Sequence, residues 1–265
     1  WHIGLTICED LWVEEEIQGQ RIKGPDPLAQ LKKERIDILL NFSASPFSHK
    51  KEFLRQKLAA KAAERLECPV MYVNQVGGND ELIFDGASFV IDQKGDLVLT
   101  LPRCREFLGI WEPGDKKKIP ITIKNQPEEM LMETLVLGVK DYAKKCGFSS
   151  ALVGLSGGID STLVAILASA ALGNENVLGV LMPSPWSSEG SIKDSLDLAL
   201  RLDIKTTTIP INSVMKSYDS VLGKALGAPP HDLTAENLQS RIRGTILMAL
   251  ANQKKHLLLS TGNKS

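Results

Sequence analysis

One stretch decides the fold: residues 152–163, which read Leu-Val-Gly-Leu-Ser-Gly-Gly-Ile-Asp-Ser-Thr-Leu. An apolar strand runs into a glycine turn, and the turn runs into a helix. Gly157 and Gly158 let the backbone turn sharply and approach an anion closely. The helix that follows points its free N–H groups and the positive end of its dipole at that anion. The stretch therefore predicts a phosphate-binding loop on an α/β sheet.

The polar side chains of this loop suit a phosphate and a divalent ion. Ser156, Ser161 and Thr162 add hydroxyl donors. Asp160 would repel phosphate, and a magnesium ion bridging it to pyrophosphate compensates that repulsion. The GK[ST] ending of a Walker loop is absent, and so is the GxGxxG spacing. We expect a phosphate-bearing ligand and Mg²⁺ here, with Asp160 as the metal ligand.

Strands and helices alternate regularly around this loop. Such alternation predicts a parallel, doubly wound sheet with helices on both faces. The expected strands are 151–155, 177–182, 205–209 and 256–260, and the expected helices are 128–146, 161–172, 188–202 and 236–254.

The first half of the chain has a different pattern, with short β-rich runs and one long helix. The expected strands are 3–7, 36–42 and 70–74, a hairpin over 87–92 and 97–100, and a helix over 50–66. Residues 111–127 read as a linker that carries a solvated lysine run, Lys116–Lys118. We expect two domains, 1–124 and 125–265.

Composition narrows the classes of partner. Lys plus Arg number 31 and Asp plus Glu 32, giving a formal net charge of −1, which does not match a dedicated nucleic-acid binder. The four cysteines form no CxxC pair, so we expect no zinc site and a reduced, cytoplasmic protein. No apolar run reaches the length of a membrane helix. Small molecules are the expected partners.

The loop resembles the SGGxDS loop of the ATP-pyrophosphatase family, whose members cleave ATP between the α and β phosphates and adenylylate a substrate. The alternative to a phosphate-binding loop is a structural glycine turn that only joins the strand to the helix. The resemblance implies ATP binding by Gly154, Leu155, Ser156, Gly157, Gly158, Ile159, Asp160 and Ser161.

Three further segments resemble NAD synthetases. Residues 181–191 are similar to their MPS-x-YSSEGS segment, with Trp186 at the usual Tyr position, and residues 236–243 are similar to their ENxQxRxR helix. Residues 260–265 are similar to their STGNKSE motif, without its final Glu. The resemblance implies that adenine meets the backbone near Met182 and Ser184 and that Thr261 binds ATP. It also implies that deamido-NAD is bound by Asn237 and by Arg241 or Arg243, with Arg241 preferred.

A cysteine ends the first strand, in the run Ile-Cys-Glu-Asp-Leu-Trp at residues 7–12. Taken alone, Cys8 suits a buried structural role better than a nucleophilic one. The run resembles the nucleophile motif of the nitrilase-like glutaminase domain that precedes the synthetase in glutamine-dependent NAD synthetases. Residues 40–51 are similar to that domain's NxSASPF…K segment. The resemblance implies that Cys8 attacks glutamine and that Ser45 and Lys51 contact it.

Together these resemblances cover nearly the whole chain, which is expected to be the central piece of a longer enzyme. They imply the C-terminal half of a nitrilase-like αββα sandwich followed by an ATP-pyrophosphatase domain. The expected reaction is ATP-dependent amidation of deamido-NAD with ammonia from glutamine, in a homo-oligomer joined through the synthetase domain. In the family a Glu and a Lys upstream complete the cysteine site, so we expect this chain alone not to hydrolyse glutamine. The alternatives are another ligase of the loop family (tRNA-modifying or GMP-synthetase-like) or an inactive nucleotide-binding fragment.

Overall fold

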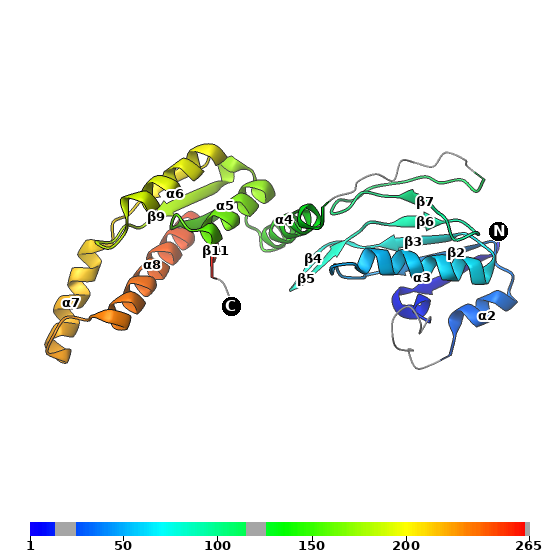
Figure 1. Ribbon diagram of the computed structural model, residues 1–265, viewed down its shortest axis with the longest axis horizontal. Coiled ribbons are helices and arrows are strands. Elements are labelled where there is room, and N and C mark those ends of the chain that lie inside the picture. Colours follow the sequence, from blue (N-terminus) through cyan, green and yellow to red (C-terminus); the bar gives the residue numbers. More distant parts are fainter. Residues whose placement is uncertain (14–24, 115–125, 263–265) are drawn as a thin grey trace. The chain divides into compact units, whose positions relative to one another are not determined.

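A computed structural model describes residues 1–13, 25–114 and 126–262 of the chain. The chain forms two compact units, Trp1–Gly138 and Val139–Ser265, and their division falls inside helix α4 (Pro127–Lys145) (Figure 1). The boundary predicted from sequence, between residues 124 and 125, lies outside the described residues. The predicted lysine run, Lys116–Lys118, lies outside them.

The first unit is built on a five-stranded sheet of order β1-β2-β3-β6-β7. Its first three strands are parallel, and the last two are antiparallel. A separate hairpin, β4–β5, follows β3. The strands are β1 (Ile3–Ile7), β2 (Ile38–Ser43), β3 (Val70–Asn74), β4 (Val76–Asn79), β5 (Leu82–Asp85), β6 (Phe89–Ile91) and β7 (Leu97–Thr100), and the helices are α2 (Pro27–Lys33) and α3 (Lys51–Leu66).

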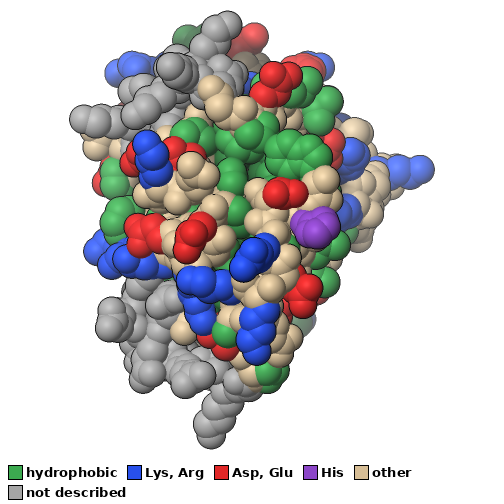
Figure 2. Space-filling model, turned by 90° about the vertical axis from the view of Figure 1, so that its right-hand side faces the viewer, with side chains coloured by type: hydrophobic (Ala, Val, Ile, Leu, Met, Phe, Trp, Pro, Cys, Tyr) green, Lys and Arg blue, Asp and Glu red, His purple; other side chains and the backbone are tan. Residues whose placement is uncertain are grey.

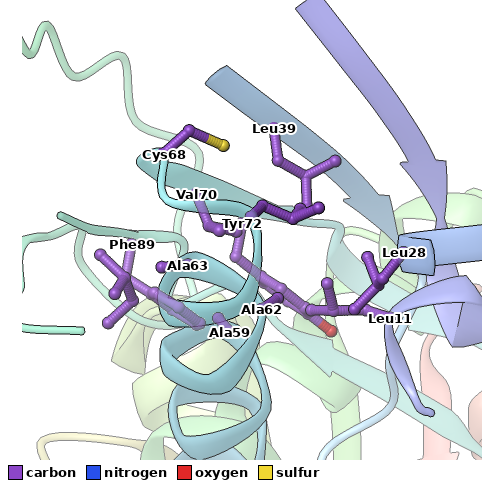
Figure 3. Close-up of a cluster of buried hydrophobic side chains, with 12 residues drawn as sticks. Leu11, Leu28, Leu39, Ala59, Ala62, Ala63, Cys68, Val70, Tyr72 and Phe89 are labelled. Atoms are coloured by element: carbon purple, nitrogen blue, oxygen red, sulfur yellow. The ribbon is translucent and has the colours of Figure 1, made fainter. Parts of the chain in front are cut away.

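One face of this sheet packs against helix α3. Small side chains at Ala59, Ala62 and Ala63 are fully buried, which lets the helix lie close to the strands. Tyr72 on β3 stacks on Phe89 of β6, with ring centroids 4.9 Å apart. Figure 3 shows these side chains gathered between the helix and the sheet. The core of the first unit therefore lies on the α3 side.

The opposite face of the same sheet carries apolar side chains that are exposed. Side chains alternate along a strand, so the partners of the buried residues point the other way. These exposed residues are Ile3, Leu5 and Ile7 of β1, Phe42 of β2 and Val73 of β3. Hydrophobic side chains also reach the surface between charged ones on the side of the molecule shown in Figure 2.

The second unit is a parallel four-stranded sheet of order β10-β9-β8-β11. One core joins the sheet to α5 and α6, and another joins its other face to α7 and α8. The predicted doubly wound parallel sheet is confirmed. The strands are β8 (Ala151–Leu155), β9 (Val177–Leu181), β10 (Lys205–Thr208) and β11 (Leu257–Leu259), and the helices are α5 (Ile159–Leu172), α6 (Glu189–Leu202), α7 (Asn212–Leu226) and α8 (Asp232–Lys254).

Several elements were not predicted from the sequence. Helix α2, helix α7 and the β4–β5 hairpin are all absent from the prediction, and α8 begins at Asp232 and not at Glu236. Helix α7 buries only Met215, although its apolar residues recur at helical spacing and several of them are exposed. The strand expected over 87–92 is shorter because Gly86 and Ala87 have positive φ angles, +67° and +49°.

None of the helices among the described residues is long and apolar enough to cross a membrane.

Candidate functional site

The glycine turn after β8 is held in a conformation that requires glycine. Gly157 has a φ of +79°, in the left-handed region. A Cβ placed on it would lie 2.5 Å from the carbonyl oxygen of Ser191 and 2.8 Å from the Ser191 Cα. Ser191 lies in the first turn of α6. Both the dihedral angle and this close approach of two backbones exclude a side chain at position 157.

Hydroxyl groups fasten the loop to the first turn of α5. Ser156 Oγ lies 3.1 Å from Ser161 Oγ and accepts a hydrogen bond from the Gly158 N–H at 3.3 Å. The Ser161 and Thr162 hydroxyls each donate to the Gly158 carbonyl at 3.0 Å. Gly158 is the N-cap of α5, and the N–H groups of a first turn have no acceptor within their helix. These hydrogen bonds hold the loop in one conformation at the N-terminus of α5.

A cavity of about 640 Å³ opens beside this loop, at the carboxyl ends of β8, β9 and β11. Strands β9 and β11 lie on opposite sides of β8, so the chain reverses its winding direction at this point. Ligands of open α/β sheets bind in the crevice at such a switch point. The cavity is walled by the ends of these strands, the first turns of α6 and one side of α8. Its size suits a small-molecule ligand.

The cavity brings together segments that are far apart in sequence. Of the residues predicted to bind ATP, Gly154, Leu155, Ser156 and Thr261 line it, as do Met182 and Ser184. The other loop residues, Gly157, Gly158, Ile159, Asp160 and Ser161, continue from Ser156 into α5. The remainder of the last motif, residues 263–265, lies outside the described residues.

The backbone groups expected to meet adenine already have partners inside the protein. The Met182 carbonyl accepts hydrogen bonds from Nε and Nη2 of Arg243, at 3.2 and 3.1 Å. The Ser184 N–H donates to Ser187 Oγ at 2.9 Å. The contact of adenine with this backbone stays a prediction.

The two candidate arginines of α8 lie in different places. Arg243 lines the cavity, and burial lowers the pKa of its guanidinium, which stays charged at neutral pH. Arg241 is exposed and donates from Nη1 to the Asn237 carbonyl at 3.2 Å. Neither Arg241 nor Asn237 is among the described residues that line the cavity. Their part in binding deamido-NAD stays a prediction.

A polar residue of the cavity that sequence reasoning did not single out is Gln239. It lines the cavity, and its Oε1 atom is buried without a hydrogen-bond partner among the described residues. An unsatisfied buried acceptor costs about 1–3 kcal/mol. Its position in the ENxQxRxR pattern was the available signal, and only the structure shows that it faces the site.

The predicted metal ligand is a single exposed carboxylate. Asp160 lies in the first turn of α5. Among the described residues, no group of three or more His, Cys, Asp or Glu side chains is placed to hold a metal ion. Mg²⁺ is usually held by one or two carboxylates together with the phosphates of a substrate. Asp160 fits such a shared site and does not fit a protein-only one.

In the first unit, Cys8 stands where β1 ends and a 3-10 turn (Cys8–Leu11) begins. Its φ is +50°, in the left-handed region, and the residue is half-buried. Asn41 holds this junction, because its Nδ2 donates to Thr6 Oγ1 at 3.0 Å and to the Cys8 carbonyl at 3.4 Å. Such strain in a non-glycine residue is typical of functional sites.

The two residues predicted to contact glutamine, Ser45 and Lys51, have different surroundings. Lys51, at the start of α3, places its Nζ 5.5 Å from the ring centre of Trp12, just after the cysteine turn. Ser45 is buried, and its N–H donates to Asn74 Oδ1 at 2.9 Å. Contact of Ser45 and Lys51 with glutamine stays a prediction.

Sequence reasoning missed the group that holds Ser45. Arg55 of α3 is 1% exposed. Its Nε donates to Ser45 Oγ at 3.0 Å, and its Nη2 donates to the Ser45 and Pro46 carbonyls at 2.8 and 3.0 Å. Its Nη1 donates to both carboxylate oxygens of buried Asp85, at 2.9 and 3.1 Å. The signal available in the sequence was a charged residue three and four positions before Leu58 and Ala59, on the buried side of the helix.

The remaining cysteines were predicted to be structural. Burial raises the pKa of the Cys68 thiol to about 11 and also raises that of Cys104. Both thiols therefore stay protonated at neutral pH, and a protonated thiol is a poor nucleophile. Cys146 is exposed and directly follows the end of α4.

Comparison with known proteins identifies the family to which the chain belongs. Residues 131–265 match the family described as NAD synthase. The chain belongs to the NAD synthase family. The loop and cavity described above lie within the matched residues.

Members of this family with long chains resemble the whole of this sequence. A glutamine-dependent NAD(+) synthetase of Synechocystis is 50% identical over 99% of this chain and 48% of its own length. One from Thermotoga maritima is 38% identical over 99% of this chain and 50% of its own. The chain thus spans about half the length of the curated relatives it matches.

A solved relative supports the same placement in the NAD synthase family. The glutamine-dependent NAD+ synthetase of Acinetobacter baumannii, in complex with ADP, superposes with a TM-score of 0.88 at 36% identity. The superposition covers 99% of this chain and 48% of that one. The synthetase from Cytophaga hutchinsonii, with a TM-score of 0.76 and 21% identity, shares the fold.

Proposed function

We propose that the protein that carries this chain converts deamido-NAD to NAD, with ATP as the activating substrate and glutamine as the nitrogen donor. One observation supports this most strongly. The phosphate loop and residues of the other three NAD synthetase-like segments, which are spread over about a hundred residues of sequence, all contribute to one cavity in the second unit.

The ATP step follows from the loop. The rigid turn at Gly157 and Gly158 presents the N–H groups of α5 to the phosphates, where the helix dipole favours negative charge. The hydroxyls of Ser156 and Thr261 line the same cavity. The nicotinate carboxylate of deamido-NAD attacks the α-phosphorus, the bond to the β-phosphate breaks, and pyrophosphate leaves. Ammonia then displaces AMP from the acyl carbon, which gives the nicotinamide.

Magnesium belongs to this proposal as a shared ion. Asp160 would hold it together with the phosphates, because the described residues form no group of three or more side chains that could hold a metal ion by themselves. When bound, it neutralises charge that develops on the phosphate oxygens.

The dinucleotide is assigned to α8. Arg243 lies in the cavity wall, where its guanidinium can neutralise a phosphate or carboxylate. Asn237 and Arg241 lie on the exposed side of the same helix, where they suit a more distant part of a long ligand. Deamido-NAD, with two nucleotides, is such a ligand.

The nitrogen donor is assigned to the first unit, as part of a nitrilase-like glutaminase. Cys8 Sγ attacks the glutamine carboxamide, the C–N bond breaks, and ammonia leaves a thioester that water hydrolyses. Backbone N–H groups beside the cysteine turn stabilise the oxyanion. The exposed apolar face of the first sheet supports a sandwich fold, because such a face needs a second layer.

Two further expectations remain part of the proposal. Helix α7 exposes Val214, Tyr218 and Val221 at a helical spacing, which supports a homo-oligomer joined through the second unit. The four cysteines are free thiols, which supports a cytoplasmic location.

The nitrogen assignment is tested in the full-length protein with the Cys8→Ala variant. NAD formation from deamido-NAD and ATP is measured with glutamine or with ammonium chloride. Loss of the glutamine-dependent reaction, while ammonia still supports NAD formation, is the expected result. If glutamine supports the variant as well as the wild type, Cys8 is not the nucleophile.

A further inference from the structure

The side chain of Trp186 has no role in the proposed reaction. Trp186 lines the cavity beside the phosphate loop, and 67% of its surface is exposed. It is the one aromatic residue among the described residues that line the cavity. Exposure of so large an apolar surface is unfavourable, and a ligand that covers the indole would remove that cost.

The backbone that carries Trp186 is fixed on both sides. Pro185 and Trp186 form the tip of a four-residue turn, closed by a hydrogen bond from the Ser187 N–H to the Ser184 carbonyl at 3.0 Å. Proline is favoured at the second position of such a turn. Ser188 then caps α6, because its Oγ accepts from the Ser191 N–H at 3.1 Å. The closed turn therefore fixes the backbone from which the Trp186 side chain lines the cavity.

The rest of the cavity wall offers hydroxyls, aliphatic side chains, the Gln239 amide and the charges of Glu236 and Arg243. The planar guanidinium of Arg243 donates to the Met182 carbonyl, and none of these groups offers an aromatic face to a heterocycle. An indole face does, since stacking is the usual way in which proteins hold a base without reading its edge.

We propose that Trp186 binds the nucleotide by stacking on its heteroaromatic ring. The inference rests on the proposed function, because it needs a nucleotide in this cavity. The ring could belong to ATP or to deamido-NAD, and the experiment below distinguishes the two.

The chain provides its own reporter for this contact. Its four tryptophans are Trp1, Trp12, Trp111 and Trp186, and only Trp186 belongs to the second unit. Calorimetric titrations with ATP, deamido-NAD and sodium pyrophosphate are carried out on the wild type and on Trp186→Ala and Trp186→Phe. Tryptophan fluorescence is followed in parallel. Tyr218→Ala, which removes an exposed aromatic ring of α7 away from the cavity lining, is the matched control.

We expect the affinity of Trp186→Ala for the stacked ligand to fall about 5- to 150-fold, the range that loss of one stacked ring gives. Trp186→Phe and Tyr218→Ala should stay close to the wild type, and pyrophosphate should bind all variants alike. The same ligand should change the fluorescence of the wild type but not that of Trp186→Phe. Equal urea midpoints for all variants show that each is folded.

The outcomes separate the inference from the proposed function. If ATP and deamido-NAD bind Trp186→Ala as tightly as the wild type, the stacking contact does not exist and the inference is wrong. The same conclusion follows if pyrophosphate loses as much affinity as the nucleotides, because it has no ring to stack. If neither nucleotide binds the wild type, the proposed function fails and the inference fails with it.

Discussion

Replacing Gly157 by alanine is expected to destabilise the second unit and to weaken nucleotide binding. The left-handed φ of +79° at this position costs an alanine about 1–2 kcal/mol. The new Cβ would also meet the Ser191 carbonyl oxygen at 2.5 Å, and such overpacking costs about 1–3 kcal/mol. Because the contact is with backbone, neither side can yield without moving the loop or the first turn of α6.

The neighbouring glycine provides a matched control. Gly158 has a φ of −87°, and a Cβ there would meet only Ser156 Oγ, at 3.4 Å. As an N-cap position, it should lose about 1 kcal/mol or less on substitution by alanine. Urea unfolding of both variants, followed by circular dichroism, gives the two free energies of unfolding.

Gly157→Ala is expected to lose about 2–5 kcal/mol, the combined cost of the dihedral strain and the overlap. Calorimetry with ATP should show weaker binding in the same variant, since the N–H groups of the loop would be displaced. If Gly157→Ala is no less stable than Gly158→Ala, the close approach of the loop to α6 does not exist as described.

Three further predictions concern buried groups. Arg55→Met should destabilise the first unit by about 3–5 kcal/mol because it leaves Asp85 buried without its partner, and Arg55→Met/Asp85→Asn should recover part of that loss in urea unfolding. Burial raises the pKa of Cys68 to about 11 while the unfolded thiol ionises near its ordinary 9.0, so stability should fall from pH 9 to 11; a Cys68→Ala variant with the same slope would contradict this. Burial lowers the pKa of His256 below 6.5, so the unfolded state takes up its proton first and stability should fall as the pH drops below 6.5. Urea midpoints of wild type and His256→Gln at pH 7.5 and 5.5 check this, and equal slopes would refute it.

The parts of the fold that the sequence predicted are those with strong local signals. The strand, glycine turn and helix at residues 152–163 lie within twelve residues of each other, and the buried strands around them are short apolar runs. The alternation of strand and helix then fixes a parallel sheet. Helix α7 was missed although its apolar residues recur at the spacing of a helix, at positions 214, 215, 218, 221 and 222, so the signal was present in the sequence.

Side-chain burial was harder to predict than the elements. In α3, the apolar Phe53 is 70% exposed, and the charged Arg55 two residues later is 1% exposed. The partners of Arg55 are Ser45, Pro46 and Asp85, which lie 9 to 30 residues away, and no local pattern identifies them. Hydrophobicity alone therefore placed Leu58, Ala62 and Leu66 correctly and failed at Phe53 and Arg55.

The two arginines of α8 show how far helix geometry alone can assign a cavity-facing residue. Arg241 and Arg243 are two residues apart, so they point about 200° away from each other around the helix. Only one of them can face a given cavity, and the structure places Arg243 there. The choice of face depends on how α8 packs on β8 and β11, which is a tertiary property.

The central claim is that the cavity beside Gly157 cleaves ATP between its α and β phosphates to activate deamido-NAD. The most direct test incubates the full-length protein with ATP, Mg²⁺ and ammonium chloride, with and without deamido-NAD, and separates the nucleotides by chromatography. The account predicts AMP, pyrophosphate and NAD in equal amounts, and only when deamido-NAD is present. Formation of ADP and phosphate, or of AMP that does not depend on deamido-NAD, would contradict it.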